Sequence, residues 1–189
     1  MTDKTAHGAP YRRTLDKVAE DLLWPDHGSS IDPEQSRRHL AIAEVLRRIP
    51  DDDYQALSES VDRWQWFIPD TWMRGYVRRW HAGVYPKNRR GQALREAPYV
   101  DMVYLGPQIE RAAWSIVVAI VAHELAHLVL RHEVFTTPDQ YEAQEAAVFD
   151  RICEWGFRKE AVLHRAGWRR WNSRERTMRK KLIRGARGG

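Results

Sequence analysis

The chain has 189 residues, 43% of them hydrophobic and 30% charged, with a formal net charge of +5. This composition is typical of a soluble globular protein and excludes a low-complexity one. The single cysteine, Cys153, has no partner for an internal disulfide, and the first ten residues contain no apolar run of a secretory signal. We therefore expect a protein of a reducing compartment, the cytoplasm.

Four segments follow one another along the chain. Residues 1–30 form an N-terminal segment, residues 31–98 a helical and mixed region, residues 99–157 a core with strand and helix patterns, and residues 158–189 a basic extension. Together they predict an α+β fold with N-terminal helices, a small sheet, a pair of helices after it and a helical C-terminal extension.

Cap residues mark two helices in the first half of the chain. Residues 32–35 have the sequence Asp-Pro-Glu-Gln, typical of an N-cap followed by a first helical turn, and predict a helix to about Arg48. The aspartates at 51–53 can cap a second helix that runs through Trp64. Aromatic and β-branched residues between 71 and 98 favour strands separated by turns.

The second half begins with a strand and continues with two helices. Residues 99–105 are rich in aromatic and β-branched side chains and predict a strand. A long helix is expected from about Gln108 to Arg131. Thr137 repeats the cap-and-proline pattern, so we predict another helix that starts there and stops at Gly156.

The apolar stretch at residues 112–130 is about long enough to cross a membrane. Its second half, however, contains two histidines and a glutamate, and no second stretch of this kind accompanies it. We interpret it as a buried core helix and expect no membrane association.

His123, Glu124 and His127 form an HExxH sequence in this helix. Residues four apart lie one above the other on a helix, so both imidazoles can bind one metal ion. Glu124 can take a proton from a water on the metal, as metal-assisted hydrolysis requires. The alternative is a pair of core histidines hydrogen-bonded to carboxylates, which would explain neither the spacing nor Glu124.

With its apolar flanks at 120–122 and 128–129, the motif resembles the active-site helix of the zincin metallopeptidases. The strand, the HExxH helix and the glutamate-bearing helix over residues 99–157 are most similar to the small ImmA/IrrE-type metallopeptidases of bacteria and mobile elements. The resemblance implies a bound Zn²⁺ and hydrolysis of peptide bonds in a protein substrate. It also implies that the strand at 100–105 is a rim where a peptide pairs by β-augmentation.

The resemblance further implies a third zinc ligand, a glutamate on the helix that follows the motif. Glu142 and Glu145 are three residues apart and face roughly the same way. If the two helices pair antiparallel, residue 145 lies level with the histidines, so we predict Glu145 as the ligand and Glu142 as the alternative. The family usually has Asp or Asn four residues after this glutamate, whereas this chain has Phe149 after Glu145 and Ala146 after Glu142.

Other histidines and several tyrosines are further candidates for the site. His132 follows His127 by five residues, off the spacing of a third histidine ligand, and we interpret it as a surface residue. His81 and His164 are alternative third ligands, without local support. The candidate donors to an oxyanion are Tyr99, Tyr104 and Tyr141.

Six of the nine tryptophans form two groups, one in the middle and one near the end of the chain. We interpret the central group as core or cleft-wall residues, with an aromatic binding surface as the alternative: Trp64, Trp66, Trp72 and Trp80. Near the end, Trp168 and Trp171 flank Arg169 and Arg170, a combination that can stack on bases and neutralise phosphates.

The basic extension carries twelve Lys and Arg against two Glu, so the other residues are net negative. Such a block can bind nucleic acid or an acidic protein, or remain solvated. The function that we predict is a zinc metallopeptidase. The alternative is a DNA-associated or non-catalytic interaction or regulatory protein on a zincin fold, which uses residues 158–189 to bind its partner.

Overall fold

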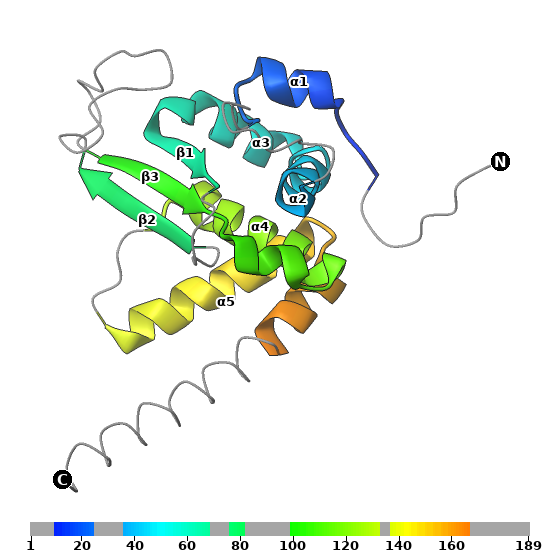
Figure 1. Ribbon diagram of the computed structural model, residues 1–189. Coiled ribbons are helices and arrows are strands. Elements are labelled where there is room, and N and C mark those ends of the chain that lie inside the picture. The colour runs from blue at the N-terminus through cyan, green and yellow to red at the C-terminus, as the bar shows by residue number, and fades with distance from the viewer. Residues whose placement is uncertain (1–9, 25–35, 69–75, 82–98, 133–136, 167–189) are drawn as a thin grey trace, which may run out of the picture.

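The computed structural model describes residues 10–24, 36–68, 76–81, 99–132 and 137–166 (Figure 1). Helices α1 to α5 span Leu15–Glu20, Arg37–Leu46, Asp51–Glu59, Trp114–Val129 and Pro138–Glu154. The strands are β1 (Trp64–Phe67), β2 (Tyr76–His81) and β3 (Tyr99–Tyr104). There are two 3-10 turns in the described residues, η1 (Val61–Arg63) and η2 (Pro107–Arg111), and residues 158–166 are helical. Helices and a small sheet thus share one chain, in agreement with the predicted α+β class.

The three strands form one mixed sheet in the order β1–β3–β2. β3 pairs in parallel with β1, where Trp66 lies opposite Val103, and antiparallel with β2, where Val77 lies opposite the same residue. The prediction that β3 is a rim for an added peptide is therefore wrong. Its backbone hydrogen bonds are already made on both sides, and β-augmentation needs an unpaired edge.

The first two predicted helices are present with different ends. α2 ends at Leu46, slightly before the expected residue, and its predicted cap at 32–35 lies outside the described residues. α3 does not reach Trp64, which belongs to β1. The Ser60 hydroxyl donates to the carbonyl of Ala56 (2.6 Å), and the chain then leaves the helix through η1.

The helix predicted from Gln108 begins as α4 only at Trp114. Residues 107–111 form the turn η2 instead, and Ala112 is extended. The reason lies in Glu110, whose carboxylate accepts a hydrogen bond from the backbone N–H of Arg37 (3.1 Å) at the start of α2. A carboxylate there stabilises the N-terminus of α2 and holds the segment before α4 out of the helix.

The predicted ends of α5 are confirmed. Thr137 Oγ1 accepts from the backbone N–H of Gln140 (3.2 Å), and Gln140 Oε1 accepts from that of Thr137 (3.3 Å), which together make a capping box. At the other end Gly156 has φ of 88°, a left-handed conformation that glycine adopts without a Cβ clash. The strand predicted at 99–105 is also present, as β3.

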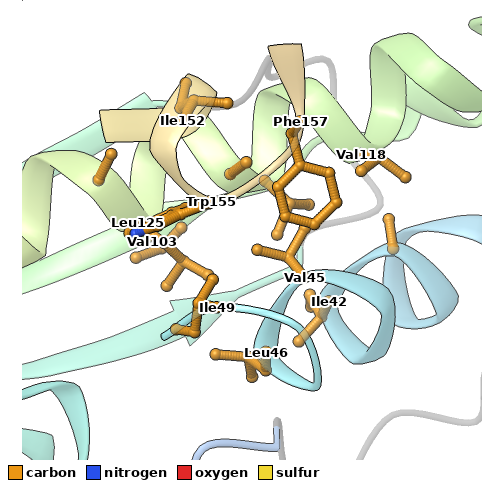
Figure 2. Close-up of a cluster of buried hydrophobic side chains, with 14 of the residues drawn as sticks. Ile42, Val45, Leu46, Ile49, Val103, Val118, Leu125, Ile152, Trp155 and Phe157 are labelled. Carbon is orange, nitrogen blue, oxygen red and sulfur yellow. The ribbon is translucent and has the colours of Figure 1, made fainter. Parts of the chain in front are cut away.

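Helix α4 lies at the centre of the fold and contacts α2, α3, α5, β2 and β3. Figure 2 shows apolar side chains from α2, α4, β3 and the end of α5 converging in one cluster: Ile42, Val45, Leu46, Ile49, Val103, Val118, Leu125, Ile152, Trp155 and Phe157. Burial on several sides explains why α4 is so apolar. Within the described residues, no helix has both the length and the apolarity that crossing a membrane would demand.

The structure describes the side chains of two of the four central tryptophans, Trp64 and Trp66. Trp64 (4% exposed) and Trp66 (7%) are buried, which confirms the core interpretation for these two. Their indole nitrogens donate to backbone carbonyls, at 3.0 Å and 2.7 Å. Trp72 lies outside the described residues, and for Trp80 only the backbone, in β2, is described.

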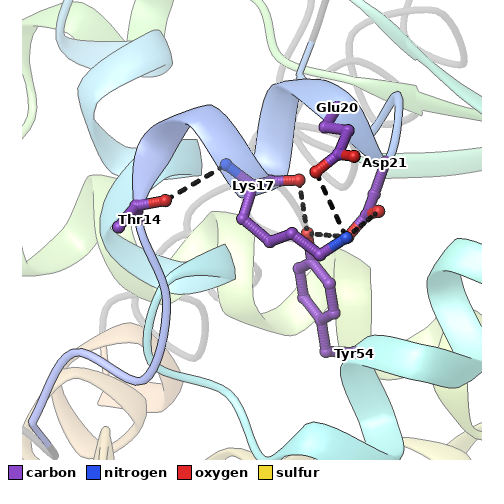
Figure 3. Close-up of polar contacts among 5 residues, drawn as sticks. All are labelled: Thr14, Lys17, Glu20, Asp21 and Tyr54. Carbon is purple, nitrogen blue, oxygen red and sulfur yellow. Dashed lines mark hydrogen bonds and ion pairs between the residues drawn. The ribbon is translucent and has the colours of Figure 1, made fainter.

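Polar contacts fasten the N-terminal segment to α3 (Figure 3). The Tyr54 hydroxyl donates to Asp21 Oδ2 (2.8 Å), Lys17 Nζ donates to Asp21 Oδ1 (2.9 Å), and Thr14 caps α1. Burial and the Asp21 carboxylate raise the pKa of Tyr54, so the phenol stays a donor. The Arg13 guanidinium lies over a face of the same ring, 3.9 Å from its centroid. These contacts stabilise the fold.

A buried carboxylate joins α3 to the end of α5. Asp53 is 8% exposed and accepts hydrogen bonds from Trp155 Nε1 (2.6 Å) and Arg151 Nη1 (3.3 Å). The Trp155 indole is only 1% exposed, so its N–H has no access to water and needs a protein acceptor.

Replacing Asp53 with alanine should therefore lower the free energy of unfolding by about 2–3 kcal/mol, since it buries the Trp155 N–H without an acceptor. Asp52→Ala is the matched control: Asp52 is exposed in the same first turn of α3, so its loss removes only a helix-dipole contribution of about 0.3–1 kcal/mol. Urea unfolding followed by circular dichroism measures both. Equal destabilisation by the two substitutions would contradict a role for the buried hydrogen bonds.

Candidate metal centre

The two histidines of the HExxH sequence lie on successive turns of α4. Their Nε2 atoms are 3.1 Å apart, and their ring centroids are 4.8 Å apart with the rings at 71°. Both side chains are half-buried. The helix is held in place by its apolar residues in the core, so His123 and His127 direct one nitrogen each to a common point.

Helix α5, which packs against α4, brings a carboxylate to the same point. Glu145 Oε1 lies 3.4 Å from Nε2 of His127, and Glu145 Oε2 lies 3.7 Å from Nε2 of His123. The alternative ligand, Glu142, is exposed one turn earlier. Among the described residues, His123, His127 and Glu145 form a group whose ligand atoms are close enough to hold one metal ion.

The separations between the candidate ligand atoms can be compared with those of a zinc site. Zinc bonds to histidine nitrogen and carboxylate oxygen are about 2.0–2.2 Å, so neighbouring ligands of a tetrahedral site are about 3.3–3.6 Å apart. The two Nε2 atoms are 3.1 Å apart. The two oxygens of the Glu145 carboxylate each approach one of them, Oε1 at 3.4 Å from His127 and Oε2 at 3.7 Å from His123, so the separations are of this size. Three protein ligands would leave a fourth position for water or substrate, as in catalytic rather than structural zinc sites.

Glu124 follows the first histidine on α4 and is buried, with 6% of its surface exposed. A carboxylate at this depth is kept apart from bulk water by the protein around it. The residue that departs from the family pattern, Phe149, is half-buried on α5, and the guanidinium of Arg165 lies 4.8 Å from its ring centroid. Phe149 thus helps to anchor the helical stretch at 158–166 against α5.

His132 is not the surface residue that its spacing suggests. α4 ends at Val129, and Arg131 takes the left-handed conformation with φ of 52°, which costs a non-glycine residue about 1 kcal/mol. The chain thereby turns back, and the backbone N–H of His132 donates to the carbonyl of His127 (3.1 Å). The half-buried imidazole of His132 then reaches the other ring nitrogen of His127, with 3.0 Å between the two Nδ1 atoms.

His164 also lies beside the cluster, although its sequence neighbourhood gives no sign of it. Its ring centroid is 5.0 Å from that of His123, with the rings at 55°. It is brought there by the turn at Gly156 and by the burial of Phe157 and Ala161 in the core. His81 is in β2, where only the backbone is described.

Of the three tyrosines, Tyr141 and Tyr104 have described side chains. Tyr141 is half-buried on α5, four residues before Glu145 and hence on the same face of the helix. Tyr104 is buried in β3. Tyr141 is therefore the tyrosine that shares a helix face with a candidate ligand. For Tyr99 only the backbone is described.

Three histidines of the cluster, His123, His132 and His164, have pKa values below the ordinary value and so favour the neutral form. Burial lowers the pKa of His123 well below its ordinary value of 6.5, and His127 and His164 lower it further. Burial also lowers the pKa of His132 and of His164, against an opposing effect of the Glu145 carboxylate. Neutral imidazoles are the form that binds metal ions.

A pH dependence of stability follows for the zinc-free protein. The unfolded chain takes up protons on these histidines below about pH 6.5, whereas the folded chain resists protonation, so stability is complete above that pH and falls below it. We expect the melting temperature in chelator to drop between about pH 7 and pH 5.5, and to drop less in His164→Gln, which removes one such group. An unchanged or rising melting temperature would contradict the prediction.

Comparison with known proteins adds no relative to this picture: no protein-family model, no curated protein and no solved structure matches the chain.

Proposed function

We propose that this protein is a zinc-dependent metallopeptidase of the zincin type, which hydrolyses peptide bonds of a protein substrate in the cytoplasm. The convergence of His123, His127 and Glu145 from two helices carries the proposal. Two imidazoles and one carboxylate are the donor set of hydrolytic zinc sites, and a glutamate next to the first histidine supplies the base.

Each residue has a role in this reaction. His123, His127 and Glu145 would hold zinc, which when bound polarises the scissile carbonyl and makes a water more acidic. Glu124 accepts a proton from the attacking water as the oxygen of that water adds to the carbonyl carbon. It then delivers this proton to the amine nitrogen as the C–N bond breaks. Its burial supports the role, because bulk water does not exchange the proton during the reaction.

Mass spectrometry of a pool of unfolded proteins and peptides tests this function. Incubation with the zinc-loaded protein should create new chain termini, which disappear on chelation and return when zinc is added back. His127→Ala is the control for a contaminating protease, because it removes one zinc ligand from an otherwise identical preparation. Cleavage that persists in this variant, or no cleavage by the zinc-loaded wild type, would contradict the proposal.

A DNA-associated role is the second candidate, and the charge of residues 158–189 favours it. Ala161 is 2% exposed and Arg165 covers Phe149, so residues 158–166 belong to the folded body. Nine of the twelve basic residues follow this stretch, in 167–189. Deleting only 167–189 should abolish a salt-dependent affinity for DNA while zinc binding is retained. DNA binding that survives the deletion would exclude the segment as its cause.

A further inference from the structure

Three histidines form a row joined by two nitrogen–nitrogen contacts. His123 and His127 meet through their Nε2 atoms (3.1 Å), and His127 and His132 meet through their Nδ1 atoms (3.0 Å). A hydrogen bond between two imidazoles needs one N–H and one lone pair. Because a neutral imidazole carries a single N–H, His127 can donate to only one of these two neighbours.

A metal bound at Nε2 of both His123 and His127 replaces the first contact and fixes the direction of the second, between His127 and His132. A metal at Nε2 of His127 needs the lone pair there, so the proton of that ring has to be on Nδ1. Nδ1–H then donates to the Nδ1 lone pair of His132, whose own proton is on Nε2. In the opposite direction His132 would donate, and Nε2 of His127 would carry a proton that blocks the metal.

We propose that His132 is a positioning residue of the metal centre: it accepts the Nδ1–H of His127 and so holds that ligand in the tautomer and ring orientation that bind zinc. The inference rests on the metal-binding part of the proposed function. It does not depend on catalysis, on the identity of a substrate or on the role of Glu124.

The end of α4 is built to supply this acceptor. Leu130 caps the helix, and the left-handed Arg131 directs the next residue back along the helix rather than away from it. The backbone of His132 is bonded to the carbonyl of His127, and its ring centroid is 5.1 Å from that of His127. Backbone and side chain of His132 thus both engage the same ligand, which limits the positions that its ring can take.

Competition with a chromogenic chelator measures the contribution of His132 to zinc affinity. His132→Leu fills the space without an acceptor and should raise the zinc Kd about 10–100-fold, the usual effect of removing an outer partner of a ligand. His132→Asn is the matched variant. Its amide Oδ1 occupies the place of the imidazole Nδ1 and accepts a hydrogen bond, so the Kd should return to within about threefold of the wild-type value.

Nuclear magnetic resonance of the zinc-loaded wild type tests the hydrogen bond directly. We expect ¹⁵N shifts of an Nδ1–H tautomer for His127 and an Nε2–H tautomer for His132, with a scalar coupling between the two Nδ1 nuclei. A merely structural role for His132 would not produce this coupling. The measurement also tests whether His132 accepts this hydrogen bond if His132→Leu fails to fold.

The outcomes separate the inference from the proposed function. Zinc binding by the wild type with an unchanged Kd in His132→Leu would overturn the inference and leave the metal site standing. A Kd in His132→Asn as weak as in His132→Leu, or an Nδ1–H tautomer of His132, would overturn the acceptor role. A wild-type protein that binds no zinc would overturn both proposals.

Discussion

Replacing Glu145 with alanine is expected to remove bound zinc, whereas Glu142→Ala should leave one ion per chain. The carboxylate of Glu145 reaches the Nε2 atoms of both histidines, at 3.4 and 3.7 Å, while Glu142 is exposed one turn away on the same helix. Without Glu145 the site keeps two neutral imidazoles and no negative charge for the dication, and it falls below the three protein ligands of a catalytic zinc site. Elemental analysis of dialysed protein measures the number of zinc ions per chain.

Glu142→Ala is a close control because both substitutions place the same residue on α5 and remove one negative charge. Circular dichroism shows whether either one changes the helix content, and alanine favours helix in both cases. His127→Ala should match Glu145→Ala in losing zinc. Loss of zinc in Glu142→Ala with retention in Glu145→Ala would reverse the ligand assignment, and zinc retained in all three variants would place the metal elsewhere.

Those features of the fold that depend on neighbouring residues could be predicted from the sequence. The start of α5 follows from Thr137 and Gln140, whose side chains bond each other's backbone, and its stop follows from Gly156. The spacing of His123 and His127 is also local, because a helix alone brings positions four apart together. Glu145 follows once the helices are assumed to pack as a pair.

Elements that depend on distant partners could not be predicted. β1 forms because Trp64 to Phe67 pair with β3, more than thirty residues further along the chain. The aromatic side chains of this segment favour a strand but also suit the buried face of a helix, so the pairing with β3 decides between the two. The late start of α4 depends on Glu110, whose carboxylate binds the N-terminus of α2. The order of the sheet likewise follows from long-range pairing, which is why β3 is central rather than a rim.

The positions of His132 and His164 beside the cluster could not be predicted for the same reason. The interpretation of His132 assumed that the helix continues to Arg131, but Arg131 is left-handed, a conformation that its residue type does not favour. His164 depends on how the chain returns after Gly156. A residue brought to a site by a turn has no periodicity to mark it, whereas a residue on the same helix has.

Glu124→Gln is expected to lower hydrolysis about 10²–10⁴-fold while zinc binding is retained, since removing a general base has an effect of this size. Glutamine has nearly the same shape as glutamate and can keep hydrogen bonds at this buried position, but it cannot take a proton from water. The rate of cleavage of one mapped peptide, with zinc measured in the same sample, gives both quantities.

This substitution separates a catalyst from a protein that only binds. Glu124 is not among the three residues whose atoms converge, so its replacement leaves the proposed metal ligands His123, His127 and Glu145 in place. An interaction protein on the same fold needs the shape and charge of its surface and would lose nothing, because Glu124 is 6% exposed. A hydrolase needs the proton acceptor and loses its turnover. Unchanged cleavage in Glu124→Gln with full zinc content would therefore exclude Glu124 as the base.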